Sequence, residues 1–160
     1  MTAQRDIRKA SLLSDYGALA TIEDMIVTRG YETTIAAGST PIIPIFTAPF
    51  PMRIMGVTGV NFGGALTLDG SNYWSFRPRR YRVVSNFSAD YVDIIGSSGT
   101  NFTISSNKLQ GEPWPFEPQA TYDDTYRLFR TGDVLAIRIA SSGSPTSLSQ
   151  LSFTVRYEPQ

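Results

Sequence analysis

The chain has no cysteine and no histidine among its 160 residues. The lack of cysteine excludes a disulfide framework, a thiolate zinc site and a cysteine nucleophile. The lack of histidine removes the commonest general base and the commonest metal ligand. A hydrolase would have to work with carboxylates alone, or with serine and lysine. We therefore expect no enzyme activity, no catalytic residue and no metal or other cofactor.

Lysine is nearly absent too, since Lys9 and Lys108 are the only lysines among 14 basic residues. The other basic residues are arginines, which are enriched in protein interfaces where lysine is depleted. Codon bias in a GC-rich genome explains the arginines equally well. The formal net charge is zero, so no overall field attracts nucleic acid or a membrane. The chain also lacks the run of about 18 apolar residues that a transmembrane helix needs.

What the chain does have is evenly spread turn residues. Its 13 glycines and 10 prolines are not collected in a linker. Between them lie short segments with strand character, and none of these predicts a long helix. About eight to ten strands at regular spacing favour an all-β fold, an antiparallel β-sandwich of the jelly-roll type. We expect one such domain over residues 25–160.

The clearest strand pattern lies near the end of the chain. Apolar residues alternate with small or polar ones over residues 133–140 and again over 149–157. A loop of serine, glycine and proline separates the two segments. Period-two patterning on both sides of such a loop predicts a β-hairpin with one buried face.

Proline and glycine set the other boundaries. Prolines reduce residues 41–46 to an edge strand or an extended loop, and three prolines make 111–118 a loop. Pro78 is expected to break a strand and to splay its neighbours onto more than one face. Glycines within 52–60 suggest a bulge or a close backbone approach.

Residues 1–24 differ from the rest and predict an extended N-terminal arm. The segment begins polar and then carries apolar residues at partly helical spacing. A free polar tail does not need such residues, so we expect the arm to contact a neighbouring subunit or another partner. The alternative is that residues 19–27 form the first strand of the chain's own sheet. The expected contact residues are Arg5, Arg8, Lys9, Leu12, Leu13 and Tyr16.

The densest group of charges lies within residues 77–82. Its members are Arg77, Arg79, Arg80 and Arg82. Arginines among aromatic residues can bind single-stranded nucleic acid, but zero net charge makes this partner less expected than a protein. We expect at least two of the arginines to contact carboxylates or carbonyls across a subunit interface. A solvated face, or ion pairs with Asp90 and Asp93, is the structural alternative.

Two tryptophans and two acidic pairs offer other functions. Trp74 and Trp114 could stack on a sugar as a glycan platform, although filling the ends of the sandwich is the favoured interpretation. Asp90 with Asp93, and Asp123 with Asp124, could serve glycoside hydrolysis or bind calcium. No surrounding motif supports either use.

Three stretches together carry a family resemblance. They are P-M-R-I-M-G-V-T-G-V, then G-G-A-L-T-L-D-G-S-N-Y, and then R-T-G-D-V-L-A-I-R-I-A-S-S-G-S-P-T-S-L-S-Q-L-S-F-T-V-R-Y. Over residues 50–157 the chain resembles jelly-roll capsid decoration or cement proteins of tailed bacteriophages, and related head-fibre modules. In that family a Gly-Asp turn precedes a strand, as Gly132 and Asp133 do here, and a small-residue loop leads to the last strand.

The resemblance implies a structural protein of the virion. It would bind the major capsid protein at the capsid surface, as a homo-oligomer, often a trimer, after assembly in the host cytoplasm. A glycan-binding module of a head or tail fibre is the alternative. Carboxylate-based hydrolysis is a third and weaker one.

Overall fold

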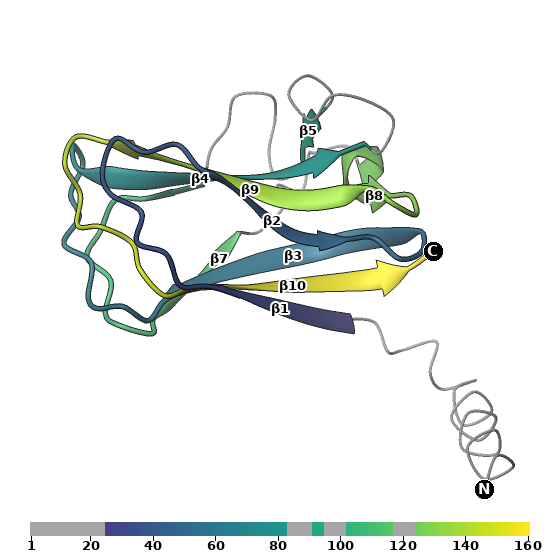
Figure 1. Ribbon diagram of the computed structural model, residues 1–160, viewed down its shortest axis with the longest axis horizontal. Helices are drawn as coiled ribbons and strands as arrows, with labels where there is room; N and C mark the ends of the chain where they lie inside the picture. Colours follow the sequence, from purple (N-terminus) through teal and green to yellow (C-terminus); the bar gives the residue numbers. More distant parts are fainter. Residues whose placement is uncertain (1–24, 83–90, 95–101, 117–123) are drawn as a thin grey trace, which may run out of the picture.

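The computed structural model describes residues 25–82, 91–94, 102–116 and 124–160. These residues form two antiparallel sheets that pack face to face, so the predicted β-sandwich is confirmed (Figure 1). The expected arm lies outside the described residues. The division between arm and domain therefore stays a prediction.

The first sheet has the strand order β1-β10-β3-β7, with β8 also paired to β3. Antiparallel ladders join all of these neighbours. β7 and β8 pair with opposite ends of β3 and thus share one edge of the sheet. The strands are β1 (Met25–Tyr31), β3 (Met52–Asn61), β7 (Pro113–Phe116), β8 (Leu128–Phe129) and β10 (Leu151–Pro159).

The second sheet has the order β2-β9-β4-β5, with β6 also paired to β4. β5 and β6 pair with opposite ends of β4 in the same way. A short 3-10 helix, η2 (Asp124–Arg127), leads into β8. The strands are β2 (Ile42–Thr47), β4 (Tyr73–Tyr81), β5 (Tyr91–Asp93), β6 (Phe102–Ile104) and β9 (Val134–Ser142).

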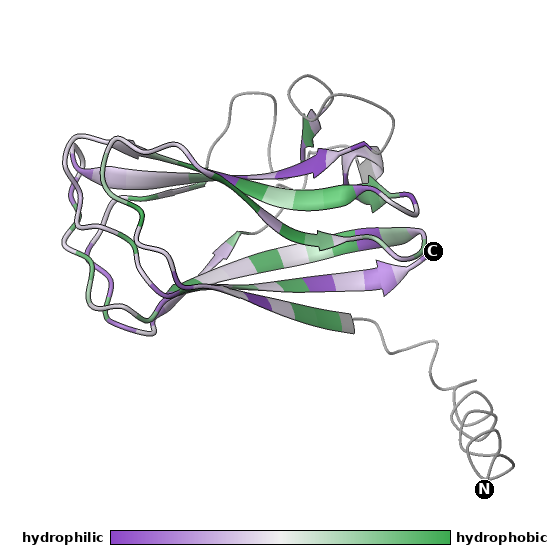
Figure 2. Ribbon diagram, in the orientation of Figure 1, coloured by the Kyte–Doolittle hydropathy of each residue, from purple (hydrophilic) through white to green (hydrophobic). Residues whose placement is uncertain are grey.

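The core lies between the two sheets. Alternate residues of β9 and β10 are fully buried, as the sequence predicted, among them Leu135, Ile137, Phe153 and Val155. Figure 2 shows β9, which lies between β2 and β4, as hydrophobic along most of its length. At 25 cal/mol per Å² of apolar area, burying each large side chain contributes about 1.5–3 kcal/mol.

The predicted C-terminal hairpin is wrong. β9 pairs with β2 and β4, whereas β10 pairs with β1 and β3, so the two strands lie in different sheets. The loop between them crosses from one sheet to the other, and a bridge between Ile35 and Leu148 holds it. The apolar faces of both strands still meet, but across the core rather than side by side.

Pro78 does not break its strand, which corrects a second expectation. β4 continues through it, and Pro78 pairs with Ile137 of β9. On its other side the Pro78 carbonyl accepts a hydrogen bond of 3.0 Å from the Ile94 N–H. In an antiparallel strand the nitrogen points to the same side as that carbonyl. The missing N–H therefore falls in the gap between β5 and β6, where no ladder bond is lost.

Residues 111–118 are not all loop either, because Pro113–Phe116 form β7. β7 lies at the edge of its sheet, where proline is tolerated at positions that do not bond to the neighbouring strand. Its two prolines are exposed, while Trp114 and Phe116 point into the core. Residues 41–46 did yield an edge strand as expected, and β2 carries a register shift between Pro44 and Phe46.

Candidate functional site

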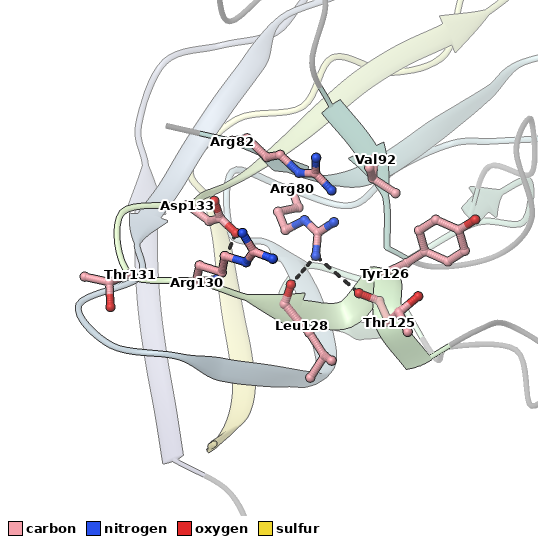
Figure 3. Close-up of a pocket in the computed structure, with 9 residues that line it drawn as sticks. All are labelled: Arg80, Arg82, Val92, Thr125, Tyr126, Leu128, Arg130, Thr131 and Asp133. Carbon is pink, nitrogen blue, oxygen red and sulfur yellow. Dashed lines mark hydrogen bonds between the residues drawn. The ribbon is translucent and has the colours of Figure 1, made fainter. Parts of the chain in front are cut away.

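One end of the sandwich holds a pocket of about 440 Å³, which we call the arginine pocket (Figure 3). The end of β4, β5, η2, β8 and the turn before β9 all contribute to it. Figure 3 shows three guanidinium groups gathered around the same hollow. The lining residues are Arg80, Arg82, Val92, Thr125, Tyr126, Leu128, Arg130, Thr131 and Asp133.

The turn that carries Arg130 is fixed by Asp133. The buried Asp133 carboxylate accepts a hydrogen bond of 2.9 Å from the Arg130 backbone N–H. The Asp133 N–H donates to the Arg130 carbonyl at 3.0 Å. Between them, Gly132 has a φ of +90°, a conformation that glycine adopts without strain. The Gly-Asp turn thus holds the Arg130 backbone while the Arg130 side chain stays exposed.

Arg80 has a structural role in the wall of the pocket. Its side chain is 7% exposed, and its Nη1 donates to the carbonyls of Thr125, at 3.2 Å, and Leu128. Its guanidinium also lies 6.0 Å from the centroid of the Phe129 ring. Arg80 therefore ties η2 and β8 to β4.

Arg77 and Arg79 point to the outer face of β4, beside β5. Arg79 is 4% exposed and its Nε donates to Asp93 at 2.8 Å, while Arg77 lies 4.0 Å from the same carboxylate. The Arg79 guanidinium also stacks 3.7 Å from the centre of the Tyr91 ring. Burial lowers the pKa of Arg79, but hydrogen bonds to Tyr81 and Asp93 outweigh it, so the pKa is raised. Arg79 remains charged at any working pH.

The predicted arginine cluster is thus divided between two roles. Arg79 and Arg80 are buried and their contacts lie within the chain, which corrects the expectation that they contact a subunit. Asp93 does pair with the cluster, as the structural alternative held, while Asp90 lies outside the described residues. Arg82 is exposed and remains the candidate for partner contact. Sequence reasoning missed Arg130, although the neighbouring Gly-Asp turn marked a fixed loop.

The two tryptophans are core residues, which corrects the proposed glycan platform. Trp74 is fully buried and its Nε1 donates to the Thr146 carbonyl at 2.9 Å. Trp114 is 2% exposed and packs 5.8 Å from the Phe76 ring. Neither ring can stack on a sugar or a base. Tyr81 is buried as well, with 3% of its surface exposed, so it cannot stack on a base either.

A second hollow, which we call the apolar groove, lies on the outer face of the second sheet. It has a volume of about 490 Å³ and lies across β2, β9 and the end of β4. Tyr81 and Val134 face the groove, whereas their sequence neighbours Arg82 and Asp133 line the arginine pocket, because successive residues of a strand point to opposite faces. The lining residues of the groove are Ile42, Pro44, Thr47, Tyr81, Val134 and Ala136.

The remaining candidate residues lie outside the part of the chain that the structure describes. These residues are Arg5, Arg8, Lys9, Leu12, Leu13, Tyr16 and Asp123. Within the described ranges, no three acidic, histidine or cysteine side chains gather as a metal site would require. In the same part of the chain, no helix is long and apolar enough to cross a membrane.

No protein-family model and no curated protein matches the chain. Among solved structures, one of infectious bursal disease virus strain Gx is similar, with 15% identity and a TM-score of 0.33. The match covers 83% of this chain and 33% of that one. Strain Gt gives 14% identity, a TM-score of 0.30, and coverage of 84% and 32%. The chain spans about a third of either matched chain, and at such TM-scores neither likeness carries an argument about function.

Proposed function

We propose that this chain is a structural protein of a virus particle. It binds the major capsid protein at the capsid surface as a decoration or cement protein and stabilises contacts between coat subunits. The glycan-binding alternative loses the two aromatic residues on which it depended, because both are buried.

The observation that carries the proposal is the composition of one end of the sandwich. The arginine pocket lies there, and its exposed Arg82 and Arg130 share the lining with Tyr126 and Leu128. Tyr126 is 39% exposed and Leu128 37%. Arginine, aromatic and aliphatic groups together on one surface are typical of protein interfaces.

The strand order supports the jelly-roll part of the proposal. Counting β5 with β6, and β7 with β8, as interrupted single strands gives eight strands. The sheet orders are then first-eighth-third-sixth and second-seventh-fourth-fifth. First pairs with eighth, second with seventh, third with sixth and fourth with fifth, as when one long hairpin is rolled into a sandwich. Such a body is rigid and can present one end to a partner.

Assembly as a homo-oligomer, such as a trimer, suits this function. Several copies joined around a capsid symmetry axis bind through several modest surfaces at once, and avidity multiplies their affinities. The N-terminal arm adds a segment that can become ordered on binding to the coat.

The test is cosedimentation with shells of the coat protein encoded alongside this chain. We expect saturable binding at a fixed ratio to coat subunits and a higher melting temperature of the shells. Leu128→Ala at the proposed interface should weaken binding about tenfold, which corresponds to 1.4 kcal/mol. Leu109→Ala is the matched control, because Leu109 is 74% exposed in the loop between β6 and β7.

The control variant should bind as the native chain does. If the native chain neither sediments with the shells nor raises their melting temperature, the proposed function is wrong.

A further inference from the structure

We propose that the arginine pocket is a carboxylate-binding site that takes the side chain of an aspartate or glutamate from a partner protein. Identifying that partner as the coat rests on the proposed function, but the chemistry of the site does not. Arg82 and Arg130 are the residues that bind the carboxylate.

The charge of the lining favours an anion. Of the nine lining residues within the described part of the chain, three are arginines and one, Asp133, is acidic. The Asp133 carboxylate already accepts the Arg130 backbone N–H. Arg82 and Arg130 are both exposed to solvent, so a carboxylate of a partner can reach both. A guanidinium presents donors in a planar fork that matches the two oxygens of a carboxylate.

The two arginines are held on rigid elements. Arg82 directly follows the last residue of β4, whose end is paired with both β5 and β9. The Gly-Asp turn fixes the backbone of Arg130, and the Ala48 carbonyl accepts the Gly132 N–H at 2.7 Å. Little backbone ordering is then needed on binding, which favours affinity.

The remaining walls favour a carboxylate on an aliphatic stem over a small inorganic anion. Val92 contributes an apolar side chain and Tyr126 a ring, while Leu128 faces Arg80 with its carbonyl (Figure 3). Thr125 and Thr131 also line the pocket, Thr125 with the carbonyl that accepts a hydrogen bond from Arg80. The methylene groups of glutamate can pack against such walls while its carboxylate reaches the arginines.

The experiment is calorimetric titration of the full chain with the blocked tripeptide acetyl-Glu-Glu-Glu-amide at low salt. The matched peptide acetyl-Gln-Gln-Gln-amide should not bind. We expect Arg82→Gln and Arg130→Gln each to weaken binding of the acidic peptide about tenfold, since each removes a charge-assisted contact. Arg29→Gln is the matched control, because it removes one exposed arginine from β1 in the other sheet. The Arg29→Gln variant should bind the acidic peptide with the same affinity as the native chain.

Three results would overturn the inference: equal affinity of the double variant R82Q/R130Q and the native chain, equal binding of the glutamine peptide, or tighter binding of phosphate than of the acidic peptide. Failure here and failure of the proposed function are distinguishable. If the chain binds the shells but not the acidic peptide, the carboxylate site is wrong and the capsid role stands. If the chain binds the acidic peptide but not the shells, the carboxylate site stands and the capsid role is wrong.

Discussion

Gly59 of β3 lies against the indole ring of Trp114, its cross-strand neighbour in β7. A Cβ on Gly59 would lie 2.0 Å from the indole Nε1, and no real contact is that short. Because Trp114 is 2% exposed and packs against the Phe76 ring, it cannot shift without disturbing the core. The sequence predicted a bulge or a close backbone approach among the glycines of 52–60. The structure has both, since Gly59 lies against the indole and the pairing of β3 with β10 shifts register next to Gly56.

Gly59→Ala should therefore lower the free energy of unfolding by about 1–3 kcal/mol, the usual cost of overpacking a core. The measurement is urea denaturation followed by tryptophan fluorescence. Gly70→Ala is the control, because nothing lies within 4 Å of its Cβ position. The control should change stability by less than about 0.5 kcal/mol. Equal stability of the two variants would mean that β7 does not pack on β3 in this way.

At the level of elements, the ion pair between Arg79 and Asp93 joins β4 to the short strand β5. These residues are also cross-strand partners in the ladder. Their side chains are only 4% and 11% exposed. An arginine so deeply buried depends on its carboxylate, because a charge without a partner is poorly tolerated away from water.

Asp93→Ala should cost about 2–3 kcal/mol of unfolding free energy, below the full cost for a completely buried pair because Asp93 keeps some exposure. Thermal and chemical denaturation both measure this. The double variant R79L/D93L should recover part of the loss, because it removes the buried charge together with its partner. A single variant as stable as the native chain would show that β5 is not held by this pair.

Elements also show where sequence reasoning stops. The alternation in β9 and β10 correctly identified the buried face of each strand, because side-chain direction is a local property with a period of two. The same alternation cannot tell which strand lies alongside, since pairing is decided by contacts far apart in the chain. β10 instead pairs with β1 and β3, whose paired residues lie at least ninety positions earlier in the chain. The hairpin prediction failed for this reason.

At the level of the whole molecule, the sandwich fold could be predicted from the sequence, whereas the position of the arginine pocket could not. Evenly spaced Gly and Pro in a chain without helical periodicity were enough to predict a sandwich. The pocket, in contrast, combines Arg82, Val92 and Arg130 from three separate segments. Composition drew attention to residues 77–82 but could not separate buried Arg79 and Arg80 from exposed Arg82, because that depends on where β5 and η2 pack.

The N-terminal arm gives the last prediction. Its apolar residues Leu12, Leu13, Tyr16, Leu19 and Ile22 need a surface to cover them, and β1 already begins at Met25 as an edge strand of the first sheet. If a partner supplies that surface, deletion of residues 2–20 should leave the melting temperature within about 2 °C of the native value, since the sandwich core is intact. The same deletion should abolish oligomerisation or binding to the coat shells. Differential scanning calorimetry and size-exclusion chromatography with light scattering measure the two effects. A truncated chain that melts several degrees lower and still associates normally would instead place these apolar residues in the chain's own core.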